Sequence, residues 1–232
     1  MPWVVMILSA AVASVTLFVG PLDRSVRASS YFLMLTLIIL VSGIRYKTGY
    51  DFDNYADMYS YISAGGESEG VEWGWRLICQ TANLLFNSPL GVFLLSALLI
   101  YGLIGSVLYF ESDFSAVAMM AFLLNLQFYW ESLSILRQYV AMAICLMAGW
   151  LWIRGNKTAF LAAVAVATAF HVTAIVALVI PALSWWRFRV AYVLAMVVVA
   201  VVTSVVLSDL IMYADLFSKY QAYFDGTIAA EG

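Results

Sequence analysis

The chain has 232 residues, of which 65% are hydrophobic and only 11% are charged. A typical soluble domain has about 25% charged residues, so this composition excludes a soluble globular protein. The formal net charge is -3, from 11 lysine and arginine residues against 14 aspartate and glutamate residues. No basic stretch could follow a phosphate backbone, so nucleic acid is not an expected partner.

Metal and redox chemistry have little support in the residue types. Cys79 and Cys145 lie far apart and lack the paired spacing of a metal or redox motif. His171 is the only histidine, so a hydrolytic zinc site is not expected. The sequence therefore predicts no metal and no cofactor.

Apolar runs long enough to cross a bilayer recur along the chain. A hydrocarbon core of about 30 Å needs roughly 20 helical residues. We predict membrane helices over Trp3–Gly20, Ser30–Ile44, Pro89–Phe110, Ser115–Glu131, Ser134–Ile153 and Val190–Leu207. The expected fold is all-α, a single polytopic transmembrane domain over residues 1–232 with about eight membrane segments.

Two further segments need separate interpretation. The apolar stretch Thr158–Leu183 contains His171 and Pro181, and we expect two short helices that meet at His171, with one long span as the alternative. The segment Trp73–Phe86 is amphipathic, and we expect it to form a helix that lies in the outer membrane interface.

The orientation of the chain follows from its basic loops, because short loops rich in lysine and arginine favour the cytoplasm. Three such pairs are present: Arg24 with Arg27, Arg154 with Lys157, and Arg187 with Arg189. Placing them inside puts residues 45–72 in an outer loop and residues 208–232 at the outer face, with further helices expected after them. Counted from these anchors at about 1.5 Å per residue, four residues lie toward the outer side, namely Arg45, Arg137, His171 and Asp209.

The segment Arg45–Tyr55 is the densest polar cluster of the chain. Charged residues at membrane depth are functional candidates by default. Arginine and tyrosine at a helix end are also typical interfacial anchors. The spacing of the residues leaves both interpretations open.

Arg137 and Gln138 begin an apolar helix shortly after Glu131. One interpretation is an ion pair between Arg137 and Glu131. The other is anion binding, because an arginine beside the free amides of a helix N-terminus suits a phosphate or pyrophosphate.

Two more positions carry two interpretations each. His171 is either a hydrogen-bonded strut or a functional residue at a break between membrane helices. Glu72 precedes Trp73, Gly74 and Trp75, an aromatic surface on which sugar rings could stack, but an interfacial aromatic belt explains these residues equally well.

In their order along the chain, these motifs resemble the EpsG-type, Wzy-like family of bacterial exopolysaccharide and O-antigen polymerases. The resemblance extends roughly over residues 44–180. It rests on Arg45, Gly49, Asp51 and Tyr55 after an early span, then Glu72 with Gly74, then Ser134 to Ala141, then Ala169 to Ala174.

The resemblance implies a GT-C-like, inverting glycosyltransferase that crosses the bacterial cytoplasmic membrane several times. Its donor and acceptor would be undecaprenyl-pyrophosphate-linked oligosaccharides at the outer face, and its other partners would be membrane lipid, a flippase and a chain-length regulator. The catalytic residues that it implies are Asp51, Glu72 and His171. The substrate-binding residues that it implies are Arg45, Tyr55, Trp73, Arg137 and Gln138.

In such an enzyme, cationic side chains would stabilise the departing pyrophosphate. A carboxylate, Asp51 or Glu72, would deprotonate the acceptor hydroxyl.

Two other classes of function stay open. A transporter or flippase would need polar residues through the bilayer midplane, where the predicted spans carry almost no charge. A membrane acyltransferase that uses His171 would share the apolar composition. Analysis of the lipid-linked products separates the three classes, because only a polymerase lengthens glycan chains.

Overall fold

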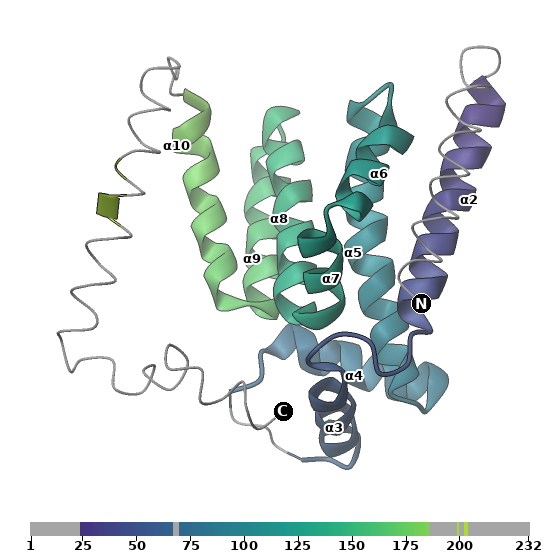
Figure 1. Cartoon of the computed structure of the whole chain (residues 1–232). Helices are drawn as coiled ribbons and strands as arrows, with labels where there is room; N and C mark the ends of the chain where they lie inside the picture. Colours follow the sequence, from purple (N-terminus) through teal and green to yellow (C-terminus); the bar gives the residue numbers. More distant parts are fainter. Residues whose placement is uncertain (1–23, 67–69, 186–198, 200–201, 204–232) are drawn as a thin grey trace. The chain divides into compact units, whose positions relative to one another are not determined.

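The computed structural model describes residues 24–66, 70–185, 199 and 202–203 (Figure 1). The chain divides after Pro181 into two compact units, and the arrangement given below is that of the first. The described part of the chain contains helices and no strands, which confirms the all-α prediction for these residues. The elements are α2 (Arg24–Gly43), α3 (Phe52–Ser63), α4 (Trp73–Phe86), α5 (Leu90–Glu111), α6 (Ser115–Leu124), α7 (Leu126–Ser134), α8 (Leu136–Ile153), α9 (Lys157–Phe170), the 3-10 helix η1 (Val172–Val179) and α10 (Ile180–Trp185).

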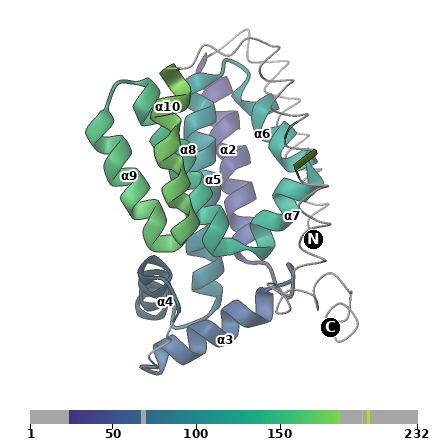
Figure 2. The same ribbon diagram turned by 90° about the vertical axis from the view of Figure 1, so that its left-hand side faces the viewer.

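Among the described residues, three helices are long and apolar enough to cross a membrane, namely α2, α5 and α8. They match three predicted spans, with ends that differ by at most two residues except at the start of α2, which begins six residues before the predicted Ser30. α5 packs against both α2 and α8 (Figure 2). One of the polar contacts between α2 and α5 is the hydroxyl of Tyr31, which donates to the carbonyl of Gly105 at 2.7 Å.

The stretch from Thr158 to Leu183 is broken at His171, as predicted. His171 has extended backbone angles (φ -157°, ψ 121°), which end α9 before η1 begins. The chain then turns back along α9, so that Ala177 and Ile180 pack against the buried cluster of Ala148, Phe160 and Val164. Arg187, on which the predicted orientation partly depends, lies outside the described residues.

The prediction of one continuous span over Ser115–Glu131 is wrong. The helix breaks at Asn125, which has extended backbone angles (φ -74°, ψ 92°). The Asn125 side chain accepts a hydrogen bond from the amide of Phe128 at 3.3 Å and so begins a new helix. The first part, α6, has 10 residues and is only about 15 Å long.

Two helices, α3 and α4, lie across the end of the bundle at which α8 begins (Figures 1 and 2). α4 has the bounds predicted from the sequence, Trp73–Phe86. α3 occupies a segment that was expected to be an outer loop. Its buried face consists of Tyr55, Tyr59 and Ile62, the spacing of one side of a helix.

Several expectations fall on residues that the structure does not describe. These are the predicted spans Trp3–Gly20 and Val190–Leu207 and the segment 208–232. The expected number of about eight membrane segments therefore stays a prediction.

Candidate functional site

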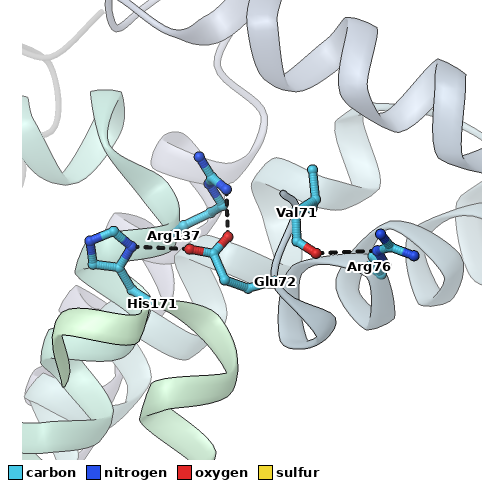
Figure 3. A network of polar contacts seen from close by, with 5 residues as sticks. All are labelled: Val71, Glu72, Arg76, Arg137 and His171. Carbon is cyan, nitrogen blue, oxygen red and sulfur yellow. Dashed lines mark hydrogen bonds and ion pairs between the residues drawn. The ribbon is translucent and has the colours of Figure 1, made fainter. Parts of the chain in front are cut away.

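One carboxylate joins two of the candidate residues, as Figure 3 shows. Glu72 Oε2 accepts from Nη1 of Arg137 at 2.5 Å, and Glu72 Oε1 lies 3.3 Å from Nδ1 of His171. The partners are 65 and 99 positions away along the chain. All three side chains are partly exposed, at 21% for Glu72, 29% for Arg137 and 28% for His171. A ligand could therefore reach them.

Each member of the cluster stands at the end of an element. Glu72 precedes α4, Arg137 lies in the first turn of α8, and His171 lies between α9 and η1. Gly74 allows α4 to approach α9 closely, because a Cβ at Gly74 would lie 2.8 Å from the carbonyl oxygen of Ala169. A larger residue there would push Glu72 away from His171.

The contact with Glu72 determines which nitrogen of His171 is available. An ionised carboxylate only accepts hydrogen bonds, so Nδ1 of His171 is the donor. In the neutral imidazole this leaves the lone pair of Nε2 as a proton acceptor. Arg137 has five N–H donors, and those not directed at Glu72 or Tyr55 can bind an anion.

Tyr55 on α3 extends this cluster. Burial raises the pKa of Tyr55, while hydrogen bonding and charge from Arg137 act in the opposite direction. The amide of Tyr55 donates to the carbonyl of Asp51 at 3.1 Å, and the charge of Asp51 also raises the pKa of Tyr55. Asp51 itself immediately precedes α3 and accepts from Nδ2 of Asn54 at 3.4 Å. Its carboxylate makes no hydrogen bond or ion pair with the other members of the cluster in the described chain.

Two predicted substrate-binding residues lie on the surface beside the cluster. The Trp73 side chain is 68% exposed at the first position of α4. Gln138 is exposed in the first turn of α8. Arg76, by contrast, donates to the carbonyl of Val71 at 3.2 Å and points away from the Glu72 carboxylate (Figure 3).

Arg45, another predicted substrate-binding residue, is buried, with only 3% of its surface exposed. Its guanidinium lies 4.8 Å from the ring centre of Phe93. It donates to three backbone carbonyls, those of Leu133 at 2.7 Å, Ser42 at 2.9 Å and Thr48 at 3.1 Å. This geometry favours a role in holding the backbone together, and substrate binding by Arg45 stays a prediction.

The turn after Arg45 packs on the break between α7 and α8. Gly49 has φ +97°, and a Cβ on it would lie 2.4 Å from the carbonyl oxygen of Leu133. The amide of Tyr50 donates to the hydroxyl of Ser134 at 3.2 Å. α8 begins directly after this break, and Arg137 is its second residue. The turn therefore fixes the position of Arg137. The sequence analysis did not predict that Leu133 and Ser134 contact this turn. The one available signal was Gly49, because a glycine in a turn can mark a close approach of two backbones.

The interpretation of Arg137 as the partner of Glu131 is wrong. Arg137 pairs with Glu72, while Glu131 accepts from Nε2 of Gln127 and from the hydroxyl of Tyr139, both at 3.2 Å. In the described residues, no group of three or more His, Cys, Asp or Glu side chains is arranged to hold a metal ion.

The comparisons with known proteins give one match. The model of the EpsG family matches residues 29–232, which is most of the chain. No curated protein and no solved structure matches the chain.

Proposed function

Because the chain belongs to the EpsG family, which is associated with polysaccharide polymerisation, we propose that it is a membrane glycosyltransferase whose active site is the Glu72–Arg137–His171 cluster. The observation that carries the proposal is the single carboxylate that holds an arginine and a histidine together at one end of the helices of spanning length. The substrates would be oligosaccharide units on a lipid pyrophosphate, undecaprenyl pyrophosphate in bacteria.

Each member has its own role in the reaction. The acceptor hydroxyl attacks the anomeric carbon of the donor sugar, and its proton passes to Nε2 of His171. The bond from that carbon to the pyrophosphate breaks, and the electron pair leaves with the pyrophosphate, which Arg137 stabilises. Glu72 keeps the imidazole in the required tautomer and orientation. Direct displacement inverts the anomeric centre.

This assignment gives His171 the proton transfer that sequence reasoning gave to a carboxylate. Both oxygens of Glu72 already have partners, and in the described part of the chain the Asp51 carboxylate makes no hydrogen bond or ion pair with Glu72, Arg137 or His171. Exposed Trp73 and Gln138 beside the cluster would contact the sugars.

The proposed side of the membrane is the outer one. Arg154 directly follows α8 and Lys157 begins α9, so both lie at the opposite end of α8 from Arg137. If this basic turn faces the cytoplasm, the cluster opens to the outside of a bacterial cytoplasmic membrane. There the lipid-linked units, delivered by a flippase, would be joined, with a chain-length regulator as a further partner.

A product assay tests the proposal. Purified protein in proteoliposomes is given lipid-pyrophosphate-linked repeat units without nucleotide sugar. We expect a ladder of longer lipid-linked glycans together with free lipid pyrophosphate. Translocation of unchanged units would indicate a flippase, and acyl transfer would indicate an acyltransferase, and either result without a ladder would overturn the proposal.

A further inference from the structure

An apolar groove of about 750 Å³ lies between α4, α5, α8 and α9. Its volume is within the range of small-molecule sites, roughly 300–1,000 Å³. Thr81 is the single hydroxyl-bearing residue of a lining that otherwise consists of aliphatic and aromatic side chains and Met147. Leu98 on α5 and Val166 on α9 line it and are 52% and 51% exposed, so the groove opens at the surface of the helical unit.

One end of the groove adjoins the Glu72–Arg137–His171 cluster. Trp73 and Phe170 line that end, and they are the chain neighbours of Glu72 and His171. From Phe170 the lining follows α9 back to Ala163, which is about 10 Å of helix. The groove therefore runs from the charged cluster along the helices.

A charged cluster at one end of an apolar groove is suited to bind an amphiphile. Arg137 is complementary to an anionic head, and the groove accepts a flexible apolar chain. Lipid tails are as apolar as leucine, so a groove within a membrane supplies little hydrophobic driving force. Its effect would be to fix the path of the chain, and so to hold the head group against the cluster.

We propose that this groove holds the isoprenoid chain of the lipid-pyrophosphate substrate, with the pyrophosphate at Arg137. The proposal rests on the function proposed above and deepens it by assigning a place to the lipid chain. A single groove that begins at the cluster favours a single-chain lipid over a two-chain phospholipid.

A photolabelling experiment tests the site without requiring turnover. Wild-type protein in nanodiscs is exposed to undecaprenyl pyrophosphate that carries a diazirine in the isoprene units nearest the head group. We expect labelled peptides from α5 and α9. Leu98→Trp fills the groove and should reduce this labelling about tenfold, the scale of a changed fit in an apolar pocket. Leu33→Trp is the matched control, because Leu33 is 56% exposed on α2, which does not line the groove.

Three results would overturn the groove assignment. They are labelling outside α4, α5, α8 and α9, equal labelling of the two variants, and loss of labelling on addition of excess phosphatidylglycerol.

Kinetics separates this proposal from the enzymatic one. On lipid-linked repeat units, Leu98→Trp should raise KM about tenfold relative to Leu33→Trp with kcat unchanged. Labelling of α5 and α9 by a protein that makes no glycan ladder would overturn the proposed function while supporting the groove. A normal ladder without labelling of these helices would overturn the groove alone.

Discussion

The two ends of α8 carry Arg–Glu pairs with the same 2.5 Å contact but different surroundings. At its beginning, Arg137 pairs with Glu72, and at its end, Arg154 pairs with Glu111. The side chains of the first pair are 29% and 21% exposed, and those of the second are 54% and 44% exposed. A short contact distance therefore does not distinguish the pair in the proposed active site from the more exposed pair.

The two Arg–Glu pairs differ in the third side chain that contacts the glutamate. Glu111 also accepts from Nε1 of Trp150 at 2.6 Å, so Arg154 and Trp150, one turn apart on α8, hold the same carboxylate oxygen. Glu72 instead joins Arg137 to His171, which comes from another element and has a ring nitrogen left for chemistry. Exposed ion pairs contribute little to stability. The comparison teaches that the cluster at the beginning of α8 joins three elements around one carboxylate, as the proposed active site requires, whereas the pair at its end joins the ends of α5 and α8.

The largest expected effect is that of His171→Gln. Glutamine can keep a hydrogen bond to Glu72 but cannot accept a proton at neutral pH. General acid–base help is typically worth about 100- to 10,000-fold, so polymer should be lost while the protein stays in the membrane and single repeat units accumulate on the lipid. Polymer is measured by gel analysis at matched protein levels, with Arg154→Gln as the control from the other end of α8. Normal polymer from His171→Gln would remove His171 from the site.

The next prediction applies one substitution to both ends. Arg137→Lys should reduce polymer by at least about tenfold, because an ammonium cannot make the planar two-pronged contact of a guanidinium with a phosphate. Arg154→Lys should leave polymer unchanged. The yields are compared at equal membrane levels. Equal yields from the two variants would mean that both pairs are only structural.

The third prediction concerns the turn that fixes the start of α8. Gly49→Ala should destabilise the protein by about 1–3 kcal/mol, because it adds strain at a positive φ and a Cβ that meets the carbonyl of Leu133. Gly65→Ala is the matched control, because Gly65 also has a positive φ (+85°) but nothing within 4 Å of its added Cβ. Thermal unfolding in detergent measures both. An equal loss at the two positions would show that the contact with Leu133 has no effect of its own.

The smallest expected effect is at the end of α8. Glu111→Gln should change neither polymer yield nor the unfolding temperature measurably, because the pair is exposed and screened by salt. Polymer yield and the unfolding temperature of the Glu111 variant are measured as above. A strong loss of polymer would show that the two ends of α8 are coupled.

Much of the site was predictable from composition and spacing. Helical rise counted from the basic loops put Arg137 and His171 on the same side, and the structure places both beside Glu72. The break at His171 and the bounds of α4 were also predicted, because a polar residue inside an apolar run and an amphipathic segment are local signals.

What the sequence could not provide depends on tertiary packing. Glu131 was a nearer partner for Arg137 along the chain than Glu72, and only the tertiary packing of α4 brings Glu72 within reach. The burial of Arg45 depends in the same way on distant carbonyls such as that of Leu133. The break at Asn125 is a different case, because Asn125 and Gln127 interrupt the apolar run there and were a local signal that the prediction overlooked.

The most direct test of the central claim is Glu72→Gln in the proteoliposome assay. Glutamine keeps the size of the side chain and removes the charge that binds Arg137 and orients His171. We predict that the glycan ladder is lost, by about 100-fold or more, while Glu111→Gln, the same substitution in the other pair, gives the wild-type ladder. A wild-type ladder from Glu72→Gln would contradict the account, because the carboxylate would then be dispensable for polymerisation.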